Sequence, residues 1–477
     1  MFKSFCTLAL AGLLAHISTP SFAAVTSTLP NSVAQALTKN KLPSDALSMV
    51  MIPLTTQGNR LEFNADTALN PASTMKLVTT YAALELLGPS YQWRTEFLTD
   101  GTLKGGTLEG NLYLKGGGDP KLNMEKLWLL LRDLRANGVQ HIKGDLILDR
   151  SYFQQPDVPE FNDDGGDANK PFLVTPDSLL VNLKAVRFIT RADDAGVRIA
   201  VEPPIANIRI ENRVKALPAT ATCPGWPEVS YNPIREFDGT QVVVSGQLPI
   251  GCSSQIYLAL LDHPGYAAGA VRAIWQELGG TLTGHDRLGE APKGARLLAR
   301  AFSPDLVEVI RDINKYSNNT MARQLFLSIG AHHRTASDSD DAAAADRVIR
   351  ALFKRKGIDT TQLVLDNGSG LSRIERISAR ALGDLLHAAW QSPYAAEFTA
   401  SMPIVAVDGT MRKRLRNTAV AGQAHIKTGT LNNVRAIAGF SRDKQGDTWA
   451  VVAIINHSKP WGASAVLDQA LIELKRR

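Results

Sequence analysis

The sequence predicts a mixed α/β (α+β) fold in which one helix-and-sheet domain is split in sequence by a β-rich region. Helical spacing of apolar residues dominates near both ends of the chain, whereas short alternating runs separated by turns dominate the middle. The length of 477 residues fits two to three domains. The expected split domain covers 24–92 and 300–477, and the inserted region covers 93–299 as two subdomains, about 93–184 plus 256–299, and 185–255.

Residues 1–23 have the pattern of a secretory signal peptide. Lys3 precedes an apolar stretch from Phe5 to Ile17, and Ser21-Phe22-Ala23 supplies the small residues of a cleavage site after Ala23. No later segment approaches the ~18 uninterrupted apolar residues that a membrane-spanning helix needs. We therefore expect an exported protein with no transmembrane span.

The cysteines lead to one structural expectation. Cys6 leaves with the signal peptide, so Cys223 and Cys252 remain. Because an even pair in an exported chain most economically forms a disulfide, we expect these two residues to be bonded to each other.

Before residue 92, the pattern predicts four elements of the split domain. They are a short helix at Val33–Leu37, strands at Leu47–Leu54 and Arg60–Asn64, and a helix from Ser73 to about Leu87. The last helix is apolar nearly all round, which predicts that it is buried.

The inserted region alternates with period two between turn-rich segments, which is typical of short strands. A long polar loop is expected from Ser151 to Asp177, because that segment is rich in Pro, Gly and Asp. The expected strands are 93–98, 110–115, 145–149, 185–190, 197–201, 207–214, 241–246 and 297–302, and the expected helices are 124–137 and 266–278.

After residue 300 the pattern returns to helices and then to two long apolar runs. The runs 435–440 and 448–455 follow Lys427-Thr428-Gly429 and are expected to form adjacent antiparallel strands beside a strand at 427–431. The expected helices are 306–316, 319–329, 340–354, 378–391 and 463–474.

Ser73 and Lys76 stand three positions apart at the start of the buried helix. This spacing places both side chains on one face of the first turn. A lysine can take the proton of a serine if burial and a second cation lower its pKa, so the pair is a candidate nucleophile and general base. Ser-x-x-Lys is a common pattern, however, and the copy Ser441–Lys444 reads as a polar hairpin.

Two further short motifs lie downstream. Ser317 and Asn319 stand at the junction of two expected helices, where a hydroxyl and an amide can face a cleft; the alternative for Ser317 is an N-cap of the second helix. Lys427-Thr428-Gly429 opens a strand, and Gly429 would let a substrate backbone approach closely. Its alternative is a strand-end lysine with a glycine bulge.

In the order Ser73-x-x-Lys76, Ser317-x-Asn319 and Lys427-Thr428-Gly429, the three motifs match those of penicilloyl-serine transferases. The chain resembles low-molecular-mass penicillin-binding proteins of the D-alanyl-D-alanine carboxypeptidase/endopeptidase group with a large insertion, peptidase S13 type. The long gap between Lys76 and Ser317, Gly117-Gly118-Asp119-Pro120 and the run 366–372 also look like this subgroup. The resemblance covers essentially the whole mature chain and implies a β-lactamase-like transpeptidase domain.

The resemblance also implies the role of each residue. Ser73 would attack the carbonyl of the penultimate D-alanine and Lys76 would take its proton. Ser317 would relay a proton to the leaving amine, while Asn319 would bind the substrate amide and hold Lys76. Lys427 and Thr428 would bind the terminal carboxylate, and the backbone N–H groups of Ser73 and Thr430 would form the oxyanion hole.

Partners and cofactors follow from the same resemblance and from the charge. We expect peptidoglycan peptides as substrates, β-lactams as covalent inhibitors, a periplasmic location, and neither a cofactor nor a metal. The net charge of +6 is dispersed except at 412–414 and 475–477, which argues against a nucleic-acid partner and leaves weak affinity for an anionic wall polymer open. A β-lactamase-like hydrolase and a catalytically silent wall-binding protein remain the rival functions.

The segment Glu160–Asp167 concentrates four carboxylates in eight residues. The family uses an acidic residue of this insertion to bind a free ammonium of the stem peptide, and Asp163 is the position that matches it. The alternative is a solvated acidic turn.

Overall fold

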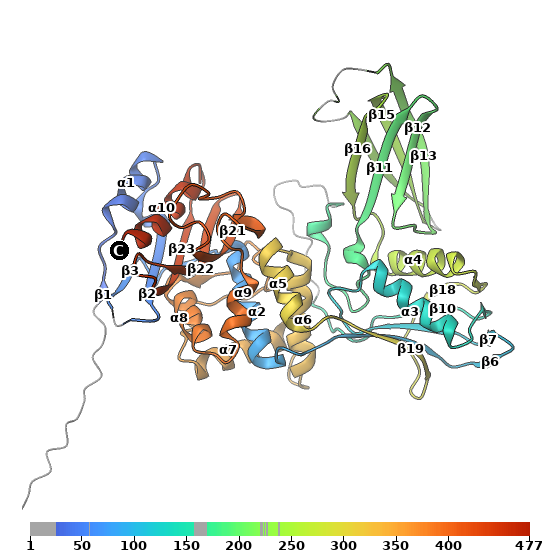
Figure 1. Cartoon of the computed structure of the whole chain (residues 1–477). Helices are drawn as coiled ribbons and strands as arrows, with labels where there is room; N and C mark the ends of the chain where they lie inside the picture. The colour runs from blue at the N-terminus through green and yellow to red at the C-terminus, as the bar shows by residue number, and fades with distance from the viewer. Residues whose placement is uncertain are drawn as a thin grey trace, which may run out of the picture.

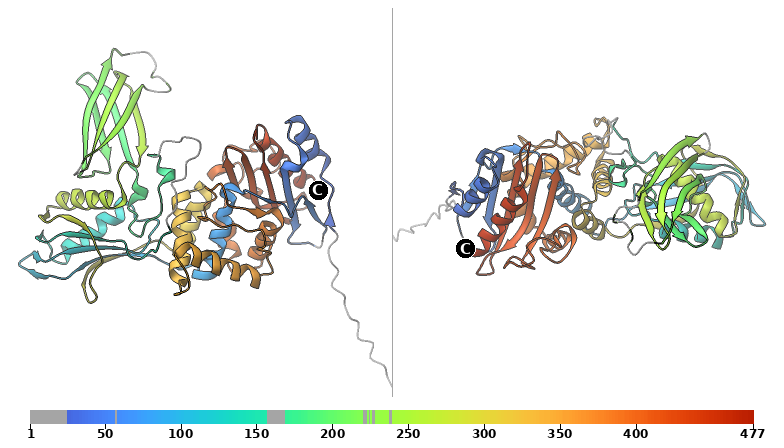
Figure 2. Two further views of the ribbon diagram at one scale, coloured as in Figure 1. Left: turned by 180° about the vertical axis from the view of Figure 1, so that it is seen from behind. Right: turned by 90° about the horizontal axis from the view of Figure 1, so that it is seen from above.

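The computed structural model describes residues 25–477, apart from 57, 157–168, 220–222, 224, 226–227 and 237–238. The predicted signal peptide and Asp163 therefore lie outside the described residues. The described chain forms an elongated molecule with a helix-and-sheet half at one end and a β-rich half at the other (Figures 1 and 2).

Strands from both ends of the chain build the central sheet of the first half. Among the described residues it has six strands in the order β1-β3-β2-β23-β22-β21. Apart from the parallel pair β1–β3, the neighbouring strands are antiparallel, with Val50 opposite Val452. The strands are β1 (Val25–Thr26), β2 (Leu47–Pro53), β3 (Arg60–Phe63), β21 (Ala424–Leu431), β22 (Val434–Arg442) and β23 (Thr448–Asn456).

Helices cover both faces of this sheet (Figure 1). Since successive strand residues point to opposite faces, Val451 packs against one helical layer and Val452 against the other. One layer consists of α1 (Asn31–Lys39) and α10 (Ala463–Arg476). The other consists of α2 (Lys76–Leu87), α5 (Leu306–Tyr316), α6 (Asn319–His333), α7 (Asp341–Arg355), α8 (Ala379–Trp390) and α9 (Ala395–Ser401).

The second half begins with two small sheets and two helices that share one apolar core. The sheets have the orders β18-β10-β8-β5-β19 and β17-β9-β7-β6. Their strands are β5 (Arg94–Thr99), β6 (Thr102–Lys104), β7 (Thr107–Glu109), β8 (Leu112–Gly116), β9 (His141–Ile142), β10 (Leu146–Asp149), β17 (Thr281–Leu282), β18 (Asp286–Leu288) and β19 (Arg296–Phe302), and the helices are α3 (Met124–Ala136) and α4 (His263–Glu277).

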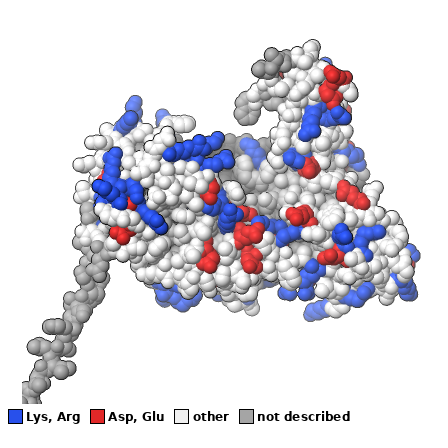
Figure 3. Space-filling view, viewed as in Figure 1, with Lys and Arg blue, Asp and Glu red and all other residues white. Residues whose placement is uncertain are grey.

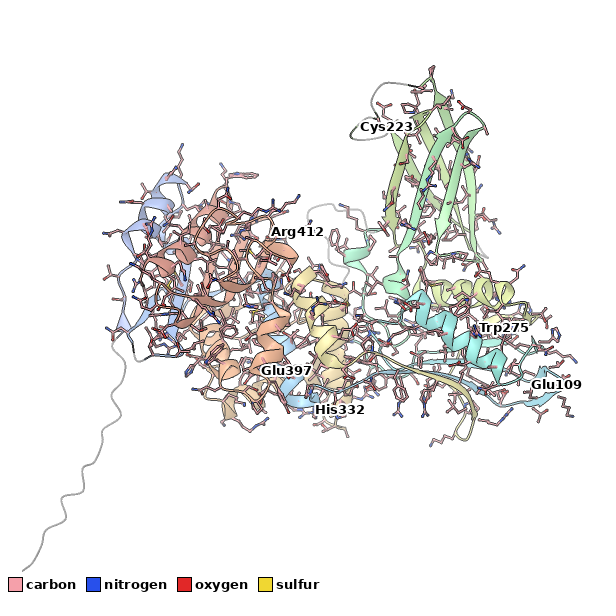
Figure 4. The ribbon with its side chains drawn as sticks, in the orientation of Figure 1. Glu109, Cys223, Trp275, His332, Glu397 and Arg412 are labelled. Atoms are coloured by element: carbon pink, nitrogen blue, oxygen red, sulfur yellow. A yellow bond between two sulfur atoms is a disulfide. The ribbon has the colours of Figure 1, made fainter. Side chains whose placement is uncertain are left out.

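Two three-stranded sheets stand on this unit and form a sandwich. One has the order β12-β11-β16 and the other β13-β15-β14. Their strands are β11 (Val186–Asp193), β12 (Gly196–Glu202), β13 (Ile208–Leu217), β14 (Val229–Glu236), β15 (Gly239–Pro249) and β16 (Ser253–Leu258). Cys223 and Cys252 form the disulfide that the sequence predicted, with Cα atoms 5.6 Å apart, at the end of the sandwich (Figure 4).

Short elements complete the description. They are β4 (Ala68–Leu69), β20 (Ile377–Ser378) and the 3₁₀ turns at Ser44–Ala46, Ala72–Met75, Pro171–Leu173, Asn182–Lys184 and Gly409–Met411. The second Ser-x-x-Lys copy lies at the β22–β23 hairpin as expected, although Ser441 itself is buried at the end of β22.

Several described elements were not predicted from the sequence, among them the strands β14 and β16 and the helix α9. Pro233 lies inside β14, where it pairs with Val242 of β15, so pairing with a neighbouring strand overrides the local signal. Helix α9 has only seven residues, too few to show a helical period.

Candidate active site

Ser73 lies in a 3₁₀ turn directly before the N-terminus of the buried helix α2. The sequence predicted a regular helix from Ser73, but the turn Ala72–Met75 precedes the α-helix, which begins at Lys76. Ala72 has a positive φ of 45°, and its N–H donates to the side chain of Asn70 at 2.9 Å. The tight turn therefore fixes the backbone on both sides of the half-buried Ser73.

Lys76 is fully buried and its amine lies among three oxygen atoms. Nζ lies 2.9 Å from Ser73 Oγ, 2.7 Å from Asn319 Oδ1 and within hydrogen-bond distance of the Ser369 carbonyl oxygen. Burial, followed by the nearby charge of Lys427, lowers the pKa of Lys76 well below its ordinary value. A neutral amine at this position can accept a proton from Ser73.

Ser317 is a hydrogen-bond partner of the second buried lysine, Lys427. It ends α5 in a left-handed conformation, with φ 57° and ψ 40°, and its Oγ accepts a hydrogen bond from Lys427 Nζ at 2.8 Å. The alternative that Ser317 caps the next helix is wrong, because Asn318 is the N-cap of α6 and accepts from Met321 N. Burial lowers the pKa of Lys427 to about 7.

The strand that carries Lys427 is β21, at the edge of the described sheet. Thr428 Oγ1 donates to Thr410 Oγ1 at 2.8 Å, and Thr430 is exposed further along the same strand. A Cβ on Gly429 would lie 2.6 Å from the carbonyl oxygen of Pro71. The glycine therefore lets β21 pack against the turn that holds Ser73.

The inserted region reaches this site through the 3₁₀ turn Pro171–Leu173. Asn319 Nδ2 donates to the Phe172 carbonyl at 3.4 Å, and Thr320 Oγ1 donates to the Val174 carbonyl at 3.0 Å. Leu173 packs against the small apolar cluster around Ala72. Since its Nδ2 is directed to Phe172, Asn319 presents its oxygen to Lys76.

The segment Gly117-Gly118-Asp119-Pro120, which resembles the family, packs inside the inserted region. A Cβ on Gly117 would lie 2.4 Å from the Arg94 carbonyl, so this glycine allows two segments of the inserted region to meet. Asp119 is buried there, and burial raises the pKa of its carboxyl to about 6.

Sequence reasoning missed the backbone contribution of Ser369 to the site. The run 366–372 was noted only as a resemblance, because a carbonyl oxygen leaves no residue-type pattern. The positive φ required at Gly368 and Gly370 was the available signal.

Within the described ranges, no group of three or more His, Cys, Asp or Glu side chains could hold a metal ion, and no helix is long and apolar enough to cross a membrane. On the face drawn in Figure 3, Lys and Arg are interspersed with Asp and Glu over both halves of the molecule.

A half-buried serine, a buried lysine with a lowered pKa beside it, and a second buried lysine that is hydrogen-bonded to Ser317 define a serine acyl-transfer enzyme of the penicillin-binding and β-lactamase-like class. The model of the D-Ala-D-Ala carboxypeptidase 3 (S13) family matches residues 29–473, and the chain belongs to that family. The sequence prediction of a serine-type D-Ala-D-Ala carboxypeptidase is thereby confirmed.

Individual proteins agree with this assignment. The chain is 30% identical over 453 residues to a D-alanyl-D-alanine carboxypeptidase of Actinomadura sp. (strain R39), covering 90% of this chain and 81% of that protein. It is 26% identical over 406 residues to the D-alanyl-D-alanine carboxypeptidase DacB of Haemophilus influenzae, covering 83% and 82%. The crystal structure of penicillin binding protein 4 from H. influenzae has the same fold, with a TM-score of 0.77 at 24% identity, covering 94% of this chain and 100% of that one.

Proposed function

We propose that this enzyme removes the terminal D-alanine from peptidoglycan stem peptides and cleaves D,D-crosslinks through an acyl-enzyme on Ser73. The observation that carries the proposal is the environment of the Lys76 amine. Asn319 Oδ1 and the Ser369 carbonyl can only accept hydrogen bonds. A neutral amine that donates its two protons to them has its lone pair left for the hydroxyl of Ser73.

The first half of the reaction forms an ester and releases an amine. Ser73 Oγ attacks the carbonyl carbon of the penultimate D-alanine while its proton passes to Lys76 Nζ. The negative charge on the carbonyl oxygen would be stabilised by the backbone N–H groups of Ser73 and Thr430. The C–N bond then breaks, and the proton that Lys76 took from Ser73 passes through Ser317 to the leaving nitrogen, with Ser317 Oγ hydrogen-bonded to Lys427 Nζ.

Substrate binding involves the opposite side of the cleft. In its charged form Lys427, with Thr428, would bind the terminal carboxylate, and the edge of β21 beyond its bridge between His425 and Ile404 would offer backbone groups to an extended peptide. In the second half of the reaction, water attacks the carbonyl carbon of the ester and gives a proton to Lys76. The ester C–O bond then breaks, Ser73 Oγ takes that proton from Lys76, and the shortened peptide leaves with a new carboxyl group.

β-Lactams would acylate the same serine. A solved complex of the H. influenzae protein with a β-lactam has the fold of this chain, with a TM-score of 0.73. The predicted signal peptide and the disulfide fit a periplasmic enzyme. Peptidoglycan is present in that compartment.

The test is intact-mass detection of a benzylpenicillin adduct together with release of D-alanine from a stem pentapeptide. Wild type should gain one adduct and release D-alanine, whereas Ser73→Ala should do neither while keeping its circular dichroism spectrum. Rapid hydrolysis of penicillin would favour the β-lactamase-like rival, and absence of any adduct would favour the silent protein. An adduct on Ser73→Ala would contradict the assignment of the nucleophile.

Asp163 is proposed to bind the free ammonium of the stem peptide's diamino acid. A desolvated pair of this kind contributes ~2–3 kcal/mol, or roughly 30- to 150-fold in kcat/KM. Asp163→Ala should therefore lower kcat/KM for amine-bearing peptides and leave penicillin acylation unchanged. Equal activity of wild type on amine-bearing and N-acetylated peptides would contradict this role.

A further inference from the structure

The loop 366–372 packs along the segment that carries the nucleophile, and its carbonyl groups accept hydrogen bonds from it. The Gly368 carbonyl accepts from Thr79 Oγ1 at 2.6 Å, and the Ser369 carbonyl accepts from Lys76 Nζ. Further along, the Ser372 carbonyl accepts from Asn70 Nδ2 at 2.8 Å. The loop thus contacts positions before and after Ser73.

Gly370 makes this approach possible. Its φ is 79°, and a Cβ there would overlap the carbonyl oxygen of Ala72. The backbone of the loop therefore lies directly against the 3₁₀ turn, and a shift of the loop would displace the partners of Lys76.

The backbone N–H groups at the start of the loop converge on one side chain, Glu375. Its Oε1 accepts from Gly368 N at 2.8 Å, from Asn367 N at 3.1 Å and, more weakly, from Asp366 N at 3.4 Å. Glu375 is fully buried. Burial raises the pKa of the Glu375 carboxyl, and the three N–H donors to Oε1 act against that shift, so this arrangement is a specific feature of the fold.

We propose that Glu375 is a positioning residue for Lys76: its carboxylate holds the start of loop 366–372, and thereby places the Ser369 carbonyl against the lysine amine. The inference rests on the proposed roles of Ser73 and Lys76. Without the Ser369 acceptor, the amine can rotate and direct a proton, rather than its lone pair, toward Ser73 Oγ. Small displacements of this kind can cost ~10²-fold in rate.

Other charged groups also act on the Lys76 amine, and the experiment has to take them into account. Lys427 on β21 and Arg323 on α6 disfavour its charged form, whereas Glu375 favours it. Arg323 is itself buried, and its Nη2 approaches the Leu371 carbonyl at 3.4 Å. A change of charge at Glu375 would alter the pH dependence, so a neutral acceptor is needed to separate charge from position.

The experiment compares Glu375→Gln, which keeps an acceptor oxygen, with Glu375→Ala, which keeps none. Benzylpenicillin acylation is followed over a range of concentrations, so that the maximal rate constant and the initial dissociation constant are obtained separately between pH 5 and 9. The matched control is Glu62→Ala, because Glu62 is also buried in this half and is paired with Arg60 and Arg380 on β3 and α8.

Glu375→Ala should lower the maximal rate constant about 100-fold with little change in dissociation constant, and Glu375→Gln should stay within about threefold of wild type at the pH of its maximum. Glu62→Ala should lower Tm without changing the rate constant. Equal losses for the Gln and Ala variants, or a wild-type rate in a folded Glu375→Ala, would overturn the proposal.

A crystal structure of Glu375→Ala provides a reading that does not depend on activity. The Ser369 carbonyl oxygen should lie more than about 3.5 Å from Lys76 Nζ, beyond hydrogen-bond distance. An unchanged contact between Ser369 and Lys76 in this variant would overturn the positioning role of Glu375. Absence of a penicillin adduct on wild type would instead count against the proposed function alone.

Discussion

Lys76 Nζ lies 2.7 Å from Asn319 Oδ1, although 243 residues separate the two in the chain. The segment before residue 92 supplies the nucleophile Ser73 and its base Lys76, and the segment after residue 300 supplies Asn319, whose amide orients the base. The inserted region fixes the orientation of this amide, because Asn319 Nδ2 donates a hydrogen bond to the Phe172 carbonyl.

Loss of the base should slow acylation far more than it weakens binding. Lys76→Ala is expected to lower the rate constant for penicillin acylation ~10²–10⁴-fold, the usual effect of removing a general base. In wild type the rate should rise with pH as Lys76 becomes neutral, and this rise should occur well below the ordinary pKa of lysine because burial and Lys427 disfavour the charged form. Acylation of the variant at nearly the wild-type rate would refute the role.

Lys427 should make the enzyme more stable as pH rises above neutrality. Its pKa is about 7 when folded and 10.5 as an ordinary lysine, so between these values the unfolded chain binds more protons and the free energy of unfolding increases with pH. One such group contributes up to about 1.4 kcal/mol per pH unit. Urea unfolding at several pH values should show a shallower rise for Lys427→Met than for wild type.

The exposed Lys413 provides the control for this measurement. Lys413→Met removes the same charge from the surface and should leave the wild-type pH dependence in place. Parallel curves for Lys427→Met and wild type would contradict the buried-lysine explanation.

Gly370 offers a test of the close contact beneath Ser73. Gly370→Ala should destabilise the protein by about 2–5 kcal/mol, from the left-handed φ and from overlap with the Ala72 carbonyl, and should also slow acylation at least tenfold. Gly357 has a similar φ of 71° but open space around it, so Gly357→Ala should cost only about 1–2 kcal/mol and leave acylation unchanged. Equal effects of the two changes in both assays would show that the contact is unimportant.

The sequence predicted the described α-helices except α9 and most of the described strands, because apolar spacing records which face of each element is buried. The bounds of the predicted strand 448–455 and the predicted helix 463–474 agree with those of β23 and α10 to within two residues. It did not predict β14, whose pairing with β15 contributes more than its local propensity. The boundaries of the split domain stay a prediction.

The candidate site was predictable to the extent that side chains carry its chemistry. Lys76 contacts Ser73 and Asn319, and Lys427 contacts Ser317, so the three motifs whose order along the chain predicted the site do lie together. The Ser369 carbonyl could not be predicted, since every residue has one. Glu375 was missed because, in Arg373-Ile374-Glu375-Arg376, a charged residue reads as surface, whereas here it is fully buried.

The pairing of β2 with β23 joins the two ends of the chain within one sheet. During synthesis β2 leaves the ribosome early, and β23, its neighbour on one side, is among the last segments to follow. The residues of the second half, by contrast, are adjacent in sequence and can pack as soon as they emerge. Catalytic competence is therefore acquired only at the end of translation, so a nascent chain that lacks its final strands carries Ser73 and Lys76 without the Lys427 strand that faces them.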